Sequence, residues 1–294
     1  MKVSVIIATY RRDTSLAGAL QSLTEQTFKD FEVVVVDDNA DKIWNEKAEK
    51  IVSDFRLNLN VVYIKNPTNL GSARSRNVGI EASKGDYVTF LDDDDLYLPN
   101  KINVQLEKML ETNADFSLTN LSLYNEDETL SEIRTRPYLL TDESKNLLLC
   151  HLKYSMTGTD TIMFKRDYLL SFGGFEAIDV GDEFYLMLKA IKQGGTFVFC
   201  DTCDVKAYVH KGDGGLSSGK GKIIGEKRIY NFKKQYFKEI KPKERRYIRM
   251  RHFAVMAFAY KRSGKPIAFM FNGALSVASA PVQCVKMLSG LKKR

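Results

Sequence analysis

Hydrophobic residues form two alternating patterns along the first hundred residues. Continuous apolar runs, rich in β-branched residues, are typical of strands covered on both faces. Between these runs, apolar residues recur at helical spacing, beginning after Thr14, which can cap a helix. The pattern predicts strands over 3–8, 31–36, 61–64 and 87–91, and helices from Thr14, over 42–55 and over 71–83. Strands alternating with helices of this length favour an α/β fold with a mostly parallel sheet.

Beyond residue 115 the alternation is less regular. The pattern there predicts strands over 116–123, 130–134, 196–200 and 205–209, and helices over 141–151 and 182–193. The segment 211–225 holds six glycines in fifteen residues, which indicates a flexible loop. Helical patterns resume over 226–238 and 243–262. We therefore place a domain boundary near 220, between a domain over 1–220 and a basic helical region over 221–294.

Two apolar segments were considered as export or membrane signals. The run 3–8 is too short for a signal-peptide core, and arginines follow where a cleavage site would be needed. The run 266–285 is diluted by Asn272, Gly273, Ser276, Ser279, Pro281 and Gln283. We therefore expect no spanning helix there, but a pair of helices lying on an apolar surface.

The composition is ordinary for a packed soluble protein. Of 294 residues, 44% are hydrophobic and 28% charged, which excludes a disordered tail, a collagen-like rod and a polytopic membrane protein. Four scattered cysteines do not make a disulfide scaffold, and they favour a reducing compartment. Cys200 and Cys203 form a C-x-x-C pair, but no second pair or nearby histidine completes a zinc site, so we expect neither metal nor redox use.

The net charge of +7 conceals a strong asymmetry. Residues 1–219 contain 24 Lys and Arg against 34 Asp and Glu, a net of −10, whereas 220–294 contain 20 against three, a net of +17. Basic and apolar residues interleave in this last segment, which favours an interfacial helix on an anionic membrane over simple solvation. No module for nucleic acid is recognisable. The interleaved residues are Arg246, Arg249, Arg251, Lys261 and Arg262 with Phe253, Val255, Met256, Phe258, Ala259 and Tyr260.

Polar clusters follow the predicted strands, where ligands bind in an open parallel sheet. Strand one runs into 8–11, strand two into Asp37 and Asp38, strand three into 66–69, and strand four into Asp92, Asp93, Asp94 and Asp95. The chain has neither the G-x-G-x-x-G sequence of dinucleotide-binding proteins nor a G-x-x-x-x-G-K-[ST] phosphate loop. Its ligand chemistry is therefore neither that of a nicotinamide enzyme nor that of a P-loop enzyme.

Four consecutive aspartates repel one another unless a cation or many donors are present. Oxygen ligands at the end of a buried strand suit Mg²⁺ or Mn²⁺, and these ions in turn suit diphosphates. The alternative is a solvated acidic turn that caps the helix after Pro99, which is the main role expected for Asp95.

Four sequence blocks in this order and spacing resemble the inverting family 2 glycosyltransferases of the GT-A fold. The blocks are VSVIIATYRR, VVVVDDNA, NLGSARSRNVGI and GDYVTFLDDDDLYLP. The resemblance is close over 1–100 and looser over 101–215. It implies an α/β GT-A (Rossmann-like) fold, with a mostly parallel central sheet flanked by helices and a C-terminal helical extension. Residues 1–100 would form the nucleotide-sugar half, and 101–220 the acceptor half.

The resemblance also implies roles for residues on the donor side. Asp94 and Asp92 would hold the metal, with Asp93 as the alternative to Asp92 beside the ribose. Asp38 would accept a hydrogen bond from the nucleobase imide, which favours uracil or thymine, unless it caps a helix. Arg74 would hold a phosphate or carboxylate, or pair with an aspartate of the run. Thr9, Tyr10 and Arg11 would line the base and phosphate.

Further residues are implied in the second half of the domain. Asp182 or Glu183 would be the catalytic base, unless both are helix caps; the family more often has Glu-Asp in that order, so the choice stays open. His210, before the glycine-rich loop, would complete the metal shell. Residues 158–160 (Gly-Thr-Asp) fall where relatives have acceptor-side residues, and 211–225 would form a lid.

The expected function is therefore metal-dependent transfer of a hexosyl or N-acetylhexosaminyl group, with Mn²⁺ or Mg²⁺, from a nucleotide sugar, expected to be a UDP-sugar. The acceptor would be a glycan hydroxyl, expected to be polyprenyl-diphosphate-linked, in surface polysaccharide synthesis at the cytoplasmic face of the membrane. No Q-x-x-R-W block is present, which disfavours a processive synthase. The alternatives are a nucleotidyltransferase of related fold and a non-catalytic nucleotide-sugar-binding protein.

Overall fold

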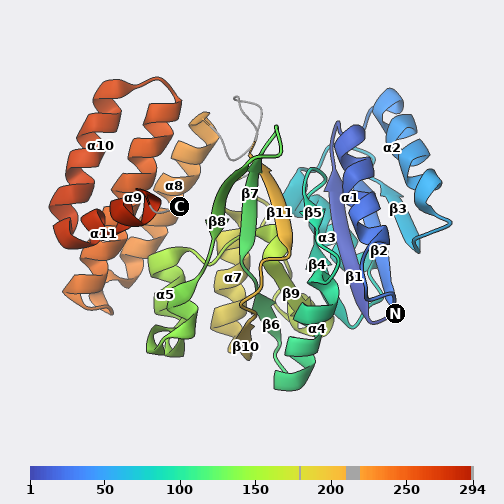
Figure 1. The fold of residues 1–294 in the computed structure, drawn as a ribbon, viewed down its shortest axis with the longest axis horizontal. Helices are drawn as coiled ribbons and strands as arrows, with labels where there is room; N and C mark the ends of the chain where they lie inside the picture. Colours follow the sequence, from blue (N-terminus) through green and yellow to red (C-terminus); the bar gives the residue numbers. More distant parts are fainter. Residues whose placement is uncertain (179, 210–218, 293–294) are drawn as a thin grey trace. The chain divides into compact units, whose positions relative to one another are not determined.

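The computed structural model describes residues 1–178, 180–209 and 219–292. Its chain forms two compact units (Figure 1). The sheet unit comprises Met1–Leu140 and Thr157–Val209, and the helical unit comprises Thr141–Met156 and His210–Arg294. The segment 141–156, which the sequence analysis placed in the acceptor half, thus clusters with the C-terminal helices. His210 and residues 211–218 of the predicted lid lie outside the described residues.

A seven-stranded sheet forms the centre of the sheet unit, in the order β10-β6-β9-β4-β1-β2-β3. All neighbouring strands are parallel except β9, which is antiparallel to both β4 and β6. The mostly parallel sheet predicted from the alternating pattern is therefore present. Its strands are β1 (Val3–Thr9), β2 (Phe31–Asp37), β3 (Val61–Lys65), β4 (Tyr87–Phe90), β6 (Phe116–Leu118), β9 (Ile162–Lys165) and β10 (Phe197–Phe199).

Helices cover both faces of this sheet, as the continuous apolar strands require. Alternate residues Val5 and Ile7 of β1 join one core cluster with side chains of α1, α2 and α4. On the opposite face, α3 lies so close that a side-chain carbon added at Gly79 would be 2.5 Å from Ile6 Cγ2. The helices of this unit are α1 (Thr14–Thr24), α2 (Lys42–Phe55), α3 (Ser72–Ala82), α4 (Lys101–Thr112), α6 (Arg166–Ser171) and α7 (Asp182–Gln193), with the 3₁₀ turns η1 (Pro137–Leu140) and η3 (Thr159–Thr161).

A second sheet of four strands has the order β5-β11-β7-β8. It corrects the prediction of one strand over 116–123, because the chain leaves the large sheet after Leu118 and enters the small one at Leu121. The polar pair Thr119 and Asn120 lies between the two strands, but two polar residues within an alternating pattern do not by themselves reveal a change of sheet. The strands are β5 (Leu96–Tyr97), β7 (Leu121–Asn125), β8 (Leu130–Arg134) and β11 (Val205–Val209).

The helical unit contains most of the basic C-terminal region. The 219–225 part of the predicted glycine-rich loop is helical, because it forms the start of α8. The run 266–285 forms the predicted helix pair, and no helix in the described part of the chain is long and apolar enough to cross a bilayer. The elements are η2 (Asp142–Lys145), α5 (Leu147–Tyr154), α8 (Gly219–Lys234), η4 (Gln235–Lys238), α9 (Pro242–Arg262), α10 (Pro266–Ser279) and α11 (Pro281–Lys292).

Candidate active site

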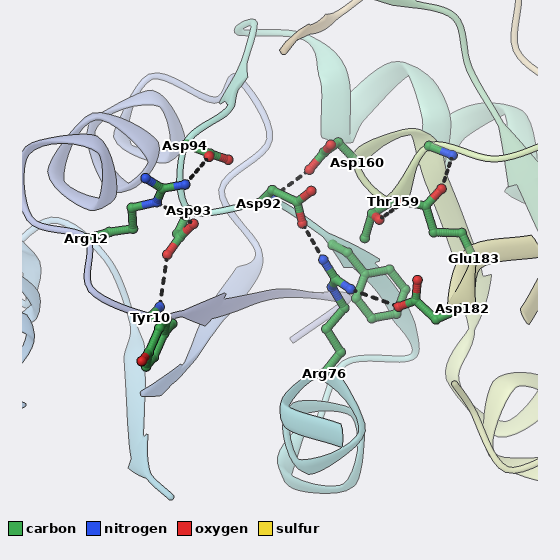
Figure 2. A network of polar contacts seen from close by, with 12 residues as sticks. Tyr10, Arg12, Arg76, Asp92, Asp93, Asp94, Thr159, Asp160, Asp182 and Glu183 are labelled. Carbon is green, nitrogen blue, oxygen red and sulfur yellow. Dashed lines mark hydrogen bonds and ion pairs between the residues drawn. The ribbon is translucent and has the colours of Figure 1, made fainter. Parts of the chain in front are cut away.

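The four aspartates after β4 have different partners, and Figure 2 shows those of Asp92, Asp93 and Asp94. Asp92 accepts a hydrogen bond from Arg76 Nη2 at 2.6 Å, and Asp94 accepts one from Arg12 Nη2 at 2.8 Å. Asp93 Oδ2 accepts from the Tyr10 backbone N–H at 3.2 Å. Asp95 is buried and accepts from the Tyr208 backbone N–H of β11 at 2.8 Å. The run is thus four separate positions and not one acidic turn.

Asp95 differs most from its expected role. The N-cap residue of α4 is Asn100, which makes no side-chain capping hydrogen bond, and Asp95 is bound to β11 instead. Sequence position alone suggested a cap because the run precedes a proline and a helix. The burial of Asp95 follows from the short strand β5, which starts at the next residue and pairs with β11.

Asp92, Asp95 and Asp160 form the carboxylate group best suited to a cation. One oxygen of each lies within 4.8 Å of the others, and Asp160 also accepts from the Asp92 backbone N–H at 2.6 Å. Burial and the neighbouring aspartates raise the pKa of Asp95 and of Asp160 well above the ordinary value. A divalent ion would relieve this cost, and ligands that are all oxygens fit Mg²⁺ or Mn²⁺.

The predicted metal ligands are only partly brought together. Asp92 belongs to the carboxylate group, whereas Asp94 lies against Arg12, and His210 is outside the described residues. Asp95 and Asp160 were not predicted as ligands. Asp160 is contributed by η3, nearly 70 residues away in the sequence, and the Gly-Thr-Asp motif gave no hint of this pairing.

A buried lysine stands behind the carboxylate group. Lys101, at the start of α4, donates to Thr89 Oγ1 at 2.7 Å and to the Tyr97 hydroxyl at 2.9 Å. Tyr97 in turn donates to the carbonyl of Phe90, the last residue of β4. Burial lowers the pKa of Lys101 to about 7, although the Asp160 charge opposes the shift. This network fixes the end of β4 from which the aspartate run begins.

Arg76 joins the two halves of the sheet unit. Its guanidinium binds Asp92 with one nitrogen and Asp182 Oδ2 with the other at 3.2 Å, and it lies over the Phe175 ring. Only 11% of its side chain is exposed. Burial opposes its charge, but Asp92 and Asp182 offset the cost and keep the pKa of Arg76 above its ordinary value.

The arginine expected at this place was Arg74, which is exposed and makes no ion pair with any residue that the structure describes. The ion pair considered for Arg74 is made by Arg76 instead. The helical period distinguishes the two arginines. Ala73 and Ile80 are both buried and Arg76 lies on their face of α3, whereas Arg74 lies on the outer face.

Asp182 and Glu183 begin α7 but point to different elements. Asp182 is buried and bound to Arg76, and burial raises the pKa of its carboxyl against the effect of the arginine. Glu183 is less buried, and its two oxygens accept from the Gly158 backbone N–H at 2.8 Å and from Thr159 Oγ1 at 2.7 Å. Both carboxylates thus bind partners outside α7, so they are more than caps of this helix.

Asp38 lies at the other end of the candidate donor site. Its buried carboxylate accepts from the backbone N–H groups of Leu70 and Gly71 and from Asn66 Nδ2, at 2.7–2.8 Å. The N-cap of α2 is Asp41, so the alternative role of Asp38 as a helix cap is not fulfilled at that helix. Since a carboxylate can accept about four hydrogen bonds, one acceptor position of Asp38 is left for a ligand.

The segment after β1 lines the same edge. Thr9 is buried, and its hydroxyl lies beside Asp93, where its donation to the carboxylate lowers the pKa of Asp93 against the effect of burial. Tyr10 is 45% exposed, and the Arg11 guanidinium lies 5.2 Å from the centre of its ring. Arg11 itself has φ +54°, and its backbone N–H binds Asn39 Oδ1 at 2.6 Å.

Comparison with solved structures identifies this arrangement as a GT-A fold. The structure of TarS from S. aureus in complex with UDP-GlcNAc matches with a TM-score of 0.61 and 19% identity, over 93% of this chain and 91% of that one. The identity is too low for more than the fold to be compared.

The sequence comparisons give the family. Residues 4–172 match the model of glycosyl transferase family 2, and the chain belongs to this family. An uncharacterized glycosyltransferase of Haemophilus influenzae is 31% identical over 196 residues, which are 65% of this chain and 62% of that protein. WfgD of Escherichia coli, a UDP-Glc:α-D-GlcNAc-diphosphoundecaprenol β-1,3-glucosyltransferase, is 27% identical over 190 residues, covering 65% and 70%. This chain thus spans about three fifths of the Haemophilus protein.

Replacing Arg76 tests whether it balances the two carboxylates. Arg76→Gln leaves Asp92 and Asp182 without their cation, so we expect a loss of about 3–5 kcal/mol in the free energy of unfolding. The loss should be smaller at pH 5 than at pH 8, because protonation removes the uncompensated charge. Urea unfolding measures both. The matched change Arg74→Gln should stay within about 0.5 kcal/mol of wild type, and equal losses in the two variants would contradict this account.

The carboxylates also predict how stability depends on pH and on a cation. Burial and Asp94 raise the pKa of Asp93 from 3.8 to about 7, and the pKa of Asp160 is raised as well. The folded protein therefore holds protons that the unfolded chain has released. Without a divalent cation, the free energy of unfolding should therefore fall as the pH rises from 5 to 7.

Mn²⁺ should stabilise the protein more at pH 7 than at pH 5, because carboxylates must lose their protons to bind it. Thermal unfolding with and without Mn²⁺ measures this effect. Asp160→Asn should flatten the pH dependence and reduce the effect of Mn²⁺. A larger stabilisation at pH 5, or one unchanged by the substitution, would show that the ion binds elsewhere.

Proposed function

We propose that this protein is an inverting glycosyltransferase that moves a sugar from a UDP-sugar to a hydroxyl group of a lipid-linked glycan. The observation that carries the proposal is Arg76, which joins Asp92 at the end of β4 to Asp182 at the start of α7. This double ion pair supports a diphosphate site and a base at one edge of the sheet. Membership of the family and the GT-A fold supply the context.

The donor is proposed to lie along the carboxyl ends of β1, β2 and β4. Asp38 has one acceptor position left and suits the imide N–H of uracil, while the exposed ring of Tyr10 offers a flat surface for a base. The hydroxyl of Thr9 and the guanidinium of Arg11 are further donors at this edge. UDP-GlcNAc bound to TarS and the UDP-Glc of WfgD support a uridine nucleotide.

A divalent cation is proposed at Asp92, Asp95 and Asp160, with Asp94 as a further carboxylate beside it. When bound, Mg²⁺ or Mn²⁺ supplies Lewis-acid stabilisation of the negative charge on a departing diphosphate. The chain's own part is to hold the carboxylates in place. Lys101 and Tyr97 fix the end of β4 from inside, and Arg76 fixes Asp92 from the side.

We assign the general base to Glu183 and a positioning role to Asp182. Asp182 is buried and paired with Arg76, whereas Glu183 is the more exposed carboxylate. Gly158 and Thr159 orient Glu183. It would take the proton from the acceptor hydroxyl as that oxygen attacks the anomeric carbon opposite the leaving diphosphate. A single displacement of this kind inverts the anomeric configuration.

The acceptor is proposed to be a sugar on a polyprenyl diphosphate, of the kind from which surface polysaccharides are built. WfgD acts on such a diphosphoundecaprenol-linked sugar, which supports the class but not the identity of the acceptor. A hexose or N-acetylhexosamine is proposed as the transferred group.

Nucleotide binding gives the first test. We expect UDP, but not GDP, CDP or ADP, to raise the free energy of unfolding in the presence of Mn²⁺ by about 2.7 kcal/mol at a hundred times its dissociation constant, and the melting temperature to rise with it. Asp92→Asn should abolish the effect, and the exposed Asp30→Asn should not. Asp94→Asn, measured in parallel, shows whether this residue also holds the ion. No shift with any nucleotide would contradict the donor site and favour a non-catalytic protein.

Transfer assays test the base. Glu183→Gln should reduce kcat by about 10²–10⁴-fold while UDP binding stays as in wild type, because the amide keeps its place but takes no proton. Asp182→Asn should impair donor binding as well, since Arg76 loses a partner. The exposed Glu176→Gln is the control. If Asp182→Asn alone abolishes kcat with normal donor binding, the two roles are reversed.

A further inference from the structure

The outer face of α10 is apolar without interruption. Every exposed residue between 266 and 285 is an apolar residue or a proline, and the sequence has no charged residue from 266 to 285. Ordinary surface helices present polar or charged side chains to water. The exposed residues are Pro266, Ile267, Met270, Phe271, Ala274, Val277 and Ala278 in α10, and Pro281, Val282 and Val285 in α11.

The large side chains of this face are strongly exposed and lie in one stripe. Ile267 is 84% exposed, Met270 70% and Phe271 64%, and their spacing of three and four residues places them on one side of α10. Ser276, on the other side, is buried, and its hydroxyl donates to the Met250 carbonyl of α9 at 2.9 Å. The stripe therefore faces away from α9.

The surroundings of this stripe are positively charged. From Arg245 to the end of the chain there are eleven Lys and Arg residues and no Asp or Glu. Lys261, Arg262 and Lys265 are exposed at the turn between α9 and α10, immediately before the stripe. An apolar face beside cationic side chains matches the acyl boundary and the phosphate groups of an anionic bilayer.

We propose that this stripe and this turn form the surface by which the protein binds an anionic membrane, with α10 lying in the plane of the interface. The charge of this region favours lipid over a second copy of the chain as the partner of the stripe. A second copy of the chain would bring two strongly basic segments together, whereas anionic lipid complements them. The inference extends the proposed function. It rests on that function in one respect, since a lipid-linked acceptor would explain why the protein binds a membrane.

The structure also corrects the membrane-facing residues expected from the sequence. Met256 and Ala259 are buried against Ile223 of α8, and of the apolar residues in that set only Phe258 is exposed, at 44%. The alternation of basic and apolar residues in α9 thus serves packing inside the helical unit. The surface offered to lipid comes from the following helix.

Vesicle sedimentation of the full chain, without donor or acceptor, tests the proposal. We expect binding to phosphatidylcholine vesicles that contain phosphatidylglycerol, and much weaker binding to phosphatidylcholine alone. Ile267→Ser with Phe271→Ser should weaken binding by roughly a hundredfold through lost apolar burial. Lys261→Gln with Lys265→Gln should weaken it by roughly thirtyfold at low salt. Ile43→Ser with Leu57→Ser changes equally exposed apolar residues of the sheet unit and should have no effect.

Three results would overturn the proposal. They are absence of binding to anionic vesicles, equal binding by wild type and the α10 double variant, and a wild-type dimer that this variant dissociates while vesicle binding is unchanged. Light scattering measures the dimer. Thermal unfolding shows whether the variants are folded. If vesicle binding behaves as expected but no nucleotide binds, the proposed activity fails and the membrane surface stands.

Discussion

The concentration of negative charge at one edge of the large sheet is the constraint on which the sheet unit depends. Asp92–Asp95, Asp160 and Asp182 bring six carboxylates into this region, and the described cations that contact or attract them are Arg12, Arg76 and Lys101. Three positive charges do not balance six negative ones. Burial is the main cause of the raised carboxyl pKa values, and repulsion between the aspartates adds to it.

This arrangement explains why distant segments meet so closely. Arg76 from α3 can neutralise Asp92 and Asp182 only if the end of β4 and the start of α7 lie at the same place. Asp160 reaches the group only because η3 leads into β9 beside β4. The antiparallel β9 therefore matters for the site, since it brings a residue of the second half to the end of a strand of the first. The electrostatics and the topology of the sheet support each other.

Much of the fold could be read from local patterns. The parallel strands, α2, α3 and α7 follow from periodicity, because burial on both faces of a strand or on one face of a helix leaves a regular trace in the sequence. The change of sheet between Leu118 and Leu121 leaves no clear trace, since leucine and serine alternate in the same way on both sides of it. Likewise, Arg76 rather than Arg74 was readable from its helical face, whereas the approach of Asp160 to Asp92 depends on tertiary structure alone.

The separate partners of the four aspartates have a consequence for evolution. The run looks like a repeat in which one residue more or less would be harmless, yet each member is defined by its distance from Phe90 on one side and from β5 on the other. A codon gained or lost would leave the composition almost unchanged but would move Tyr97 away from Lys101 and exchange a buried carboxylate for an exposed one. Alignments of related chains should therefore allow no gap within this run.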